Sequence, residues 1–213
     1  MTRRELLLPP TLVAELRQAG VVAHCVTDAD PLAAQALNLA ARAYCLPPDF
    51  VASPNDRYSH IYTLCRDANV VGTITVSMAR DGLLEQEEFL PQGLLAAYRD
   101  IICEAYRLAV DSAERPFFSM ARLLMRLSFA DGLCSGMRLA VAGAKPTMLG
   151  YYRRIGYLPF AAPSFSHPRL CTEHLIVGCP ADPTRATMFQ DLCRSLPDPL
   201  TLASLQSYFQ FGA

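Results

Sequence analysis

The hydrophobic and polar positions along this 213-residue chain follow the helical period in some segments and the strand period in others. Several helical segments begin at a proline, and three of these prolines follow an aspartate. Aspartate is a favoured helix N-cap and proline a favoured first helical residue, so each Asp-Pro pair predicts a helix start. The helices predicted from these signals cover residues 11–19, 31–44, 116–131, 145–155, 183–195 and 199–209.

Short apolar runs rich in β-branched residues predict the strands. The predicted strands cover residues 21–26, 60–66, 70–78, 101–110, 137–142, 157–161 and 174–179. Only residues 67–69 separate the second strand from the third, which predicts a hairpin. Residues 80–100 contain few strand formers and include Glu85, Glu87 and Glu88, and we expect this long connection to cover a functional site.

The order of these elements predicts a mixed sheet. The early hairpin requires antiparallel pairing, and the later strand-helix-strand alternation favours parallel pairing, so the fold class is α/β (α+β). The chain has no internal repeat and no low-complexity linker. We therefore expect a single domain over residues 1–213, with a core at about 20–180 and a C-terminal helical extension over 181–213.

Composition and charge exclude several classes of protein. Hydrophobic residues make up 52% and charged residues 18% of the chain, which is typical of an ordered globular protein. The net charge of −1 gives no general attraction to nucleic acid. No apolar run reaches the roughly 18–20 residues of a membrane span, and the apolar part of the N-terminus is too short for a signal peptide. We expect a cytoplasmic protein with no membrane span and no nucleic-acid partner.

Cysteine and histidine do not form a recognisable reactive or metal-binding pattern. The eight cysteines are scattered and include no Cys-x-x-Cys pair, so we expect free, mostly buried thiols and no metal site. The four histidines match no ligand or triad spacing, and no serine or cysteine lies in a nucleophile motif. This pattern argues against a covalent mechanism.

Two segments resemble a known superfamily. They read Glu104-Ala-Tyr-Arg107-Leu-Ala-Val-Asp111 and Tyr151-Tyr152-Arg-Arg-Ile-Gly156-Tyr157-Leu-Pro-Phe160. The second resembles the aromatic-Tyr-x-x-apolar-Gly-aromatic motif of the GNAT acyltransferases. The first resembles the branch that uses acyl carrier protein, namely the N-acyl amino acid synthases (FeeM-type) and the acyl-homoserine-lactone (autoinducer) synthases. The resemblance covers about residues 55–180 and implies the GNAT fold, a central mixed twisted sheet with helices on both faces, here with extra C-terminal helices.

One departure from the superfamily pattern bears on the acyl donor. Coenzyme A-dependent GNAT enzymes usually carry a glycine-rich turn whose backbone amides cradle the pyrophosphate. The corresponding segment here, Arg115-Pro-Phe-Phe-Ser-Met-Ala121, has no glycine. Acyl carrier protein presents a single phosphate on its 4′-phosphopantetheine arm. The resemblance therefore favours acyl-ACP over acyl-CoA as the co-substrate, with no tightly bound cofactor. The chain also lacks the tryptophan that autoinducer synthases usually carry near the N-terminus, which favours the amino acid synthases.

The resemblance implies that Glu104 is the general base for the attacking amine. Glu104 lies in an otherwise apolar strand, where burial would raise its pKa; the alternative is a structural ion pair with Arg107, which could also tune it. Residues three apart on a regular strand face opposite sides. A β-bulge would bring both side chains to one cleft beside residues 137–142, and would free the backbone amide of Leu108 as an oxyanion donor.

The resemblance further implies that Tyr152 is the general acid for the leaving thiolate; packing beside Tyr151 is the alternative. Basic residues would form a rim for the acidic carrier protein, although a solvated helix face remains the alternative for each. The residues assigned to the carrier protein or its pantetheine arm are Arg122, Arg126, Lys145, Arg153, Arg154 and Val110.

The function predicted from the sequence is transfer of a long-chain fatty acyl group from acyl carrier protein to the α-amine of an amino acid. The alternatives are an acyl-homoserine-lactone synthase with S-adenosylmethionine as acceptor, a coenzyme A-dependent N-acyltransferase, and a non-enzymatic module that binds an acyl chain or carrier protein. The expected partners are the carrier protein and the amino acid acceptor, and a lipid product would allow loose association with a membrane.

Overall fold

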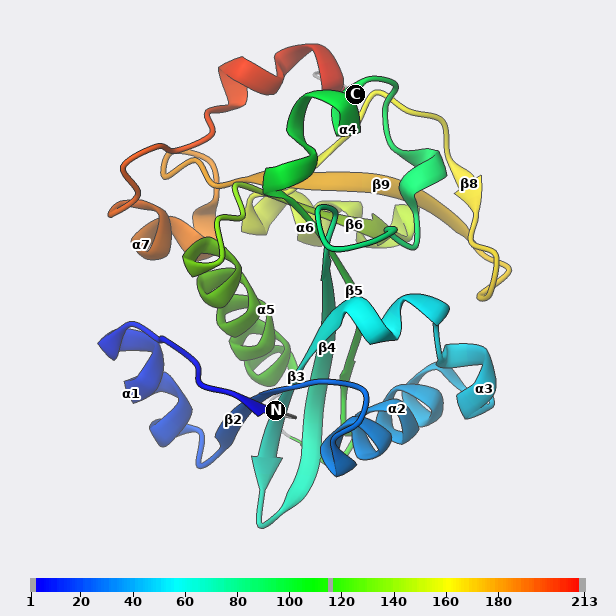
Figure 1. The fold of residues 1–213 in the computed structure, drawn as a ribbon, viewed down its shortest axis with the longest axis vertical. Helices are drawn as coiled ribbons and strands as arrows, with labels where there is room; N and C mark the ends of the chain where they lie inside the picture. The colour runs from blue at the N-terminus through cyan, green and yellow to red at the C-terminus, as the bar shows by residue number, and fades with distance from the viewer. Residues whose placement is uncertain (1–2, 115–116, 211–213) are drawn as a thin grey trace. The chain divides into compact units, whose positions relative to one another are not determined.

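The computed structural model describes residues 3–114 and 117–210. The chain forms two compact units, Met1–Ser77 with Ala105–Cys134 and Met78–Glu104 with Ser135–Ala213. Strand β5 (Ile102–Val110) contributes its first three residues to the second unit and the remainder to the first. The single-domain organisation therefore stays a prediction, and each unit is described by itself (Figure 1).

The first unit contains an antiparallel arrangement of strands that ends in β5. Its strands follow the order β1-β2-β3-β4-β5, and the first three pairs are antiparallel. The predicted hairpin is present, and the backbones of Asp67 and Ala68 have φ angles of 49° and 65°. Two successive residues with positive φ match the twist of the flanking strands. The strands that precede β5 in this unit are β1 (Arg3–Arg4), β2 (Val22–Val26), β3 (Ser59–Arg66) and β4 (Asn69–Met78).

Helices cover both faces of the strands in the first unit. The apolar cluster on one face joins Ile61 to the small residues of α2, while the next residue, Tyr62, donates a hydrogen bond from its hydroxyl to Asp131 on α5 at 2.5 Å. Successive residues of a strand point to opposite faces, so α2 and α5 lie on opposite sides. The helices of this unit are α1 (Pro10–Gln18), α2 (Pro31–Tyr44), α3 (Pro48–Val51), the short 3₁₀ helix η1 (Pro54–Tyr58) and α5 (Phe117–Cys134).

Of two helix ends predicted in this unit, one is confirmed and one is wrong. Asp30 caps α2 as expected, because its carboxylate accepts a hydrogen bond from the amide of Leu32 at 2.9 Å. The helix predicted over residues 116–131 ends later than expected, since α5 continues to Cys134. The chain turns instead at Gly136, whose φ of 87° requires the left-handed conformation that glycine adopts without strain.

The second unit contains the parallel part of the fold. Its strands follow the order β5-β6-β9-β7, with β8 beside β9. The β5–β6 pair is parallel, with Glu104 opposite Val141, and the pairs with β9 are antiparallel. The predicted mixed α/β architecture is therefore confirmed. The further strands are β6 (Leu139–Ala144), β7 (Leu158–Pro159), β8 (Phe165–Ser166) and β9 (Glu173–Pro180).

Short helices complete the second unit. Leu94, Leu139 and Leu205 belong to its apolar core, which joins the connection after β4 and the C-terminal segment to the strands. The helices of this unit are η2 (Glu87–Phe89), α4 (Leu94–Tyr98), η3 (Arg99–Ile101), η4 (Pro146–Met148), α6 (Leu149–Ile155), η5 (Thr187–Phe189), α7 (Gln190–Cys193) and η6 (Leu202–Tyr208).

Both helices predicted for the C-terminal extension are present in shorter form, and their predicted starts are wrong. The Asp182 carboxylate does not start a helix at residue 183: it accepts hydrogen bonds from Thr184 in a turn and from the amide of Leu202 at 3.1 Å. Helical structure begins only at Thr187, and the second segment is a 3₁₀ helix that begins at Leu202 rather than 199. Within the described ranges, no helix is long and apolar enough to cross a membrane.

Candidate active site

Arg107 lies in the part of β5 that belongs to the first unit, and the strand is irregular at this residue. Its φ of 54° is in the left-handed region, which is unusual for a residue with a large side chain. The guanidinium group is 9% exposed and binds both carboxylate oxygens of Asp56, with Nη1 donating to Oδ2 at 2.9 Å and Nη2 to Oδ1. Nη1 also donates to the backbone carbonyl of Val51 at 3.2 Å. This bidentate pair holds an arginine in a backbone conformation that would otherwise be costly.

Asp56 is itself fixed by local structure. It belongs to η1, where Ser53 is the N-cap and the Asp56 carboxylate accepts a hydrogen bond from the Ser53 amide at 2.9 Å. Asp56 was not among the site residues predicted from the sequence. The available signal was the serine three residues earlier, a capping-box spacing that indicates a helix start and says nothing of a partner 51 residues away.

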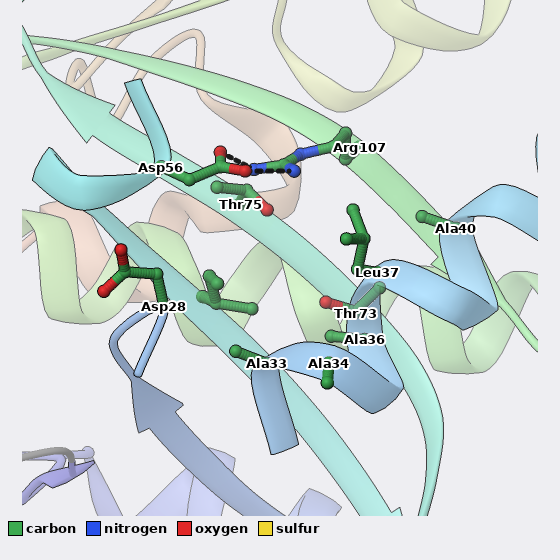
Figure 2. A pocket seen from close by; sticks show the side chains of 11 residues that line it. Asp28, Ala33, Ala34, Ala36, Leu37, Ala40, Asp56, Thr73, Thr75 and Arg107 are labelled. Atoms are coloured by element: carbon green, nitrogen blue, oxygen red, sulfur yellow. Dashed lines mark hydrogen bonds and ion pairs between the residues drawn. The ribbon is translucent and has the colours of Figure 1, made fainter. Parts of the chain in front are cut away.

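A pocket of about 200 Å³ lies beside this ion pair in the first unit. Figure 2 shows the Asp56–Arg107 pair along one side of the pocket and the small residues of α2 along another. Ala36 and Ala40 leave room there because their side chains are short. The hydroxyl of Thr73, a fully buried residue that lines the pocket, has no hydrogen-bond partner among the residues that the structure describes. Apolar walls with a few polar groups are typical of small-molecule sites.

Glu104 lies in the second unit, in the first part of β5, and is 1% exposed. Its Oε2 accepts a hydrogen bond from the backbone amide of Glu85 at 2.5 Å. Burial raises the pKa of Glu104 to about 8; the nearby Glu87 carboxylate also raises the pKa, and a hydrogen bond from the backbone of Gln86 lowers it. The carboxyl group therefore exchanges its proton close to neutral pH, as a general base must.

The connection predicted to cover a site does reach Glu104, since it supplies the Glu85 amide. Two contacts hold this connection to residues near β8. The Glu85 carboxylate pairs with Arg169, and the Phe89 ring stacks on Phe165 with 4.0 Å between ring centroids. The Glu85 amide, which donates to Glu104, is thus held in place by the side chains of Glu85 and Phe89, at the two ends of residues 85–89.

Tyr152 lies on α6 in the second unit. Its ring packs edge to face against Tyr157 and Tyr151, with centroid distances of 5.4 and 5.9 Å, so the packing given as the alternative is present. Burial, with a smaller effect of Tyr151, raises the pKa of Tyr152 to about 12, so the phenol stays protonated at neutral pH. Ring packing and proton donation are therefore compatible.

The predicted carrier-binding arginines of α5 differ in exposure. Arg122 is exposed, as a carrier-binding residue must be. Arg126 is 3% exposed and pairs with Glu15 on α1 at 3.3 Å, so its assignment to a basic rim is wrong. The two arginines lie one helical turn apart on the same side of α5, and α1, which packs against α5, covers residue 126.

The other predicted binding residues have varied surroundings. Lys145, Arg153 and Arg154 are exposed in the second unit, the last two in the final turn of α6. Val110 is buried at the end of β5, and the backbone carbonyl of Leu108 accepts a hydrogen bond from the hydroxyl of Tyr44 at 3.1 Å. The shared face of Glu104 and Arg107, their cleft with residues 137–142, and the oxyanion role of the Leu108 amide stay predictions.

The other chemistries considered from the sequence gain no support. The eight cysteines are free thiols, and five of them are buried. No group of three metal-ligating side chains occurs in residues 3–114 and 117–210. Of the glycine-free segment after β5, residues 115 and 116 lie outside the described residues.

Comparison with known proteins connects these features to one family. The family model described as "N-acyl amino acid synthase FeeM" matches residues 37–178, which include Asp56, Glu104 and Tyr152. No curated protein matches the chain.

Solved structures show the same fold at low sequence identity. FeeM, an N-acyl amino acid synthase from uncultured soil microbes, superposes with a TM-score of 0.59 at 16% identity, over 75% of this chain and 90% of its own. An acyl-CoA N-acyltransferase from Pseudomonas aeruginosa gives a TM-score of 0.52 at 15% identity, over 75% and 99% of the two chains. TofI, solved in a ternary complex with an inhibitor and MTA, gives 0.56 at 16% identity, over 81% and 99%. The predicted GNAT acyltransferase fold is confirmed by these likenesses.

Proposed function

We propose that this chain, which belongs to the FeeM family of N-acyl amino acid synthases and is an N-acyltransferase, transfers a long-chain fatty acyl group from acyl carrier protein to the α-amine of an amino acid. The observation that carries the proposal is the Glu104 carboxyl, buried in a strand and with a pKa raised to about 8. A group that titrates near neutral pH can accept the proton that a protonated amine must lose before attack.

The proposed reaction is aminolysis of a thioester in one ternary complex. The amine nitrogen forms a bond to the acyl carbon, and the bond from that carbon to the pantetheine sulfur breaks. Glu104 takes the proton that the nitrogen loses, and the Tyr152 hydroxyl gives a proton to the leaving thiolate. The backbone amide of Leu108 would stabilise the oxyanion, and Arg107 would hold the irregular β5 backbone that presents this amide.

Acyl carrier protein is the proposed donor because the segment after β5 lacks glycine and because basic residues are exposed on α5 and α6. We expect activity with acyl-ACP and weak or no turnover with acyl-CoA. Activity with acyl-ACP should fall as salt rises, because charges on the rim are screened over about 8–10 Å at ordinary ionic strength. Equal, salt-insensitive activity with acyl-CoA would remove the carrier protein from the mechanism.

Charge reversal at Arg122 tests the carrier-binding surface. We expect Arg122→Glu to raise the KM for acyl-ACP while leaving kcat for a small acyl-pantetheine donor nearly unchanged, because only the carrier protein contacts that residue. Arg185→Glu, the same change at another exposed arginine, is the matched control. Steady-state kinetics with both donors provide the measurement. An equal rise of KM for both donors would argue against a carrier-specific contact.

The pocket beside Arg107 is proposed to hold hydrocarbon of one of the substrates, since Ala36, Ala40 and Leu37 form its walls. We expect Ala36→Leu to fill part of the pocket and narrow the range of substrates accepted. Turnover of a series of acyl-ACP chain lengths, and of a series of amino acids, shows which substrate loses its larger members. Unchanged profiles in both series would mean that the pocket is not used.

Mass spectrometry of lipid extracts from cells that express the protein tests the product. A fatty acyl amino acid supports the proposal, an acyl-homoserine lactone supports the autoinducer alternative, and a new acylated amine made only from acyl-CoA supports the coenzyme A alternative. Binding of acyl-ACP without any product would indicate the non-enzymatic module.

A further inference from the structure

Two buried acceptor oxygens in the second unit lack a donor. Among the residues that the structure describes, neither Oε1 of Glu104 nor Oε1 of Gln86 has a hydrogen-bond partner. Glu104 is 1% and Gln86 5% exposed. Folded proteins almost always pair buried polar atoms, so two unpaired acceptors in the same unit indicate a place where a ligand supplies the missing donors.

The backbone near Gln86 is tied directly to Glu104. Gln86 directly follows Glu85, whose amide donates to Oε2 of Glu104 at 2.5 Å. The Gln86 side chain is therefore carried by the same short segment that holds the carboxylate in place.

Gly143 makes room for the Gln86 side chain on β6. A β-carbon at Gly143 would lie 2.6 Å from the Gln86 amide nitrogen and oxygen, which is too close for any other residue without movement of the amide. Glu104 pairs with Val141 on β6, and Gly143 lies two residues further on the same strand. Residues two apart on a strand share a face, so the Gln86 amide and the Glu104 carboxyl lie over one face of the β5–β6 pair.

We propose that Gln86 is a substrate-binding residue whose side-chain oxygen, together with Glu104, holds the attacking amino group. The inference rests on the proposed N-acyl transfer. An α-amino group supplies several N–H donors at once, whereas a thioester carbonyl, a carboxylate or a phosphate supplies none, so two unpaired acceptors select the amine. The two residues then have different roles. The neutral Gln86 amide orients the amine but cannot take its proton, and the Glu104 carboxylate removes that proton. The product amide retains one N–H, so it can satisfy only one of the two oxygens, and this favours release.

The variant Gln86→Met tests the proposal, because methionine has similar length, packs against Gly143 and cannot accept a strong hydrogen bond. With acyl-ACP as donor and the amino acid that the parent enzyme acylates fastest as acceptor, we expect the KM for the amino acid to rise about tenfold. The kcat at saturating acceptor and the KM for acyl-ACP should change little. Gln190→Met, the same exchange at an exposed position, is the control.

Gly143→Ala provides a second test with Gln86 unchanged. The added methyl group displaces the amide, so this variant should show the same selective rise in the acceptor KM. The double variant should be no worse than either single variant, because both remove the same interaction.

The outcomes separate the inference from the proposed function. If the parent acylates no amino acid in a panel of the twenty common ones, the proposed function fails. If the parent is active and Gln86→Met keeps the parent's acceptor KM, or raises only the KM for acyl-ACP, the assignment of Gln86 to the amine is wrong. Thermal unfolding of Gln86→Met at or above the parent's midpoint is expected, since the exchange removes a buried unpaired oxygen; a lower midpoint with parental kinetics would indicate a packing role instead.

Discussion

Replacing Glu104 with glutamine is expected to lower kcat by on the order of 10²–10⁴, the usual worth of a positioned general base. Glutamine keeps the size of the side chain and an oxygen for the Glu85 amide, so the fold should persist. In the parent enzyme kcat should rise with pH to a plateau above about 8, as Glu104 loses its proton. The variant should lack this inflection, so its defect should grow up to about pH 8 and shrink only above that pH, where more of the amine is already unprotonated. A pH–rate profile of both proteins provides the measurement.

The same substitution changes how stability depends on pH. The folded parent keeps the Glu104 proton up to a pKa of about 8, whereas the unfolded chain loses it near its ordinary value of 4.5. The contribution of this group to the free energy of unfolding is therefore present at low pH and is lost as pH rises to about 8. Glu104→Gln removes this loss, so the variant should gain stability relative to the parent between about pH 5 and 8. Denaturant unfolding at several pH values checks this gain.

These two readouts separate the roles considered for Glu104. A catalytic base gives a large loss of kcat together with a variant that gains relative stability as pH rises. A structural ion pair gives a lower unfolding midpoint at every pH above the carboxylate pKa. A variant that unfolds and turns over like the parent would leave the mechanism without its base.

Replacing Asp56 with asparagine is expected to produce the largest loss of stability among these changes. The Arg107 guanidinium would keep the Val51 carbonyl but lose a carboxylate that binds it through two hydrogen bonds. Breaking a pair this buried costs about 3 kcal/mol, because a charge remains without its partner. For a chain of this size the thermal midpoint should fall by roughly 6–12 °C. Differential scanning calorimetry provides the measurement.

Two further variants control this prediction. Asp28→Asn changes an exposed carboxylate that lines the same pocket and should alter the free energy of unfolding by at most about 0.5 kcal/mol. Asp56→Asn combined with Arg107→Met removes both charges and should be more stable than Asp56→Asn alone. A midpoint within one or two degrees of the parent for Asp56→Asn would mean that the pair does not hold β5 in its irregular conformation.

Local signals explain which predicted helices form. The Asp30 carboxylate accepts a hydrogen bond from the Leu32 amide, and the apolar residues of α2 pack on the strands of the first unit. The helix start and the apolar face therefore agree, and α2 forms as predicted. Asp182-Pro183 is the same pair of residues, yet the Asp182 carboxylate accepts hydrogen bonds from the Thr184 hydroxyl and from the Leu202 amide. The hydrogen bond from Leu202, 20 residues away, competes with the helix start, and no local pattern contains that information.

The sequence predicted some residues of the candidate site and missed others. Glu104, Arg107 and Tyr152 were identified because they lie in short motifs that resemble a family, and Arg126 was misassigned because its partner Glu15 comes from a different helix. Asp56 and Gln86 were missed because neither lies in such a motif. Each acquires its role from a residue far away in the chain.

The sequence by itself determined the alternation of strands and helices, the hairpin after β3, the burial of Glu104 in an apolar strand and the family motifs, since all of these depend on residues close together in the chain. Only the tertiary structure decided that Arg107 pairs with Asp56, that Arg126 is buried against α1 and that Gln86 fills the space left by Gly143. The physical reason is that pairing and burial depend on which side chains packing brings together. Glycine at position 143 specifies room for a neighbour, and the fold alone determines that the neighbour is Gln86.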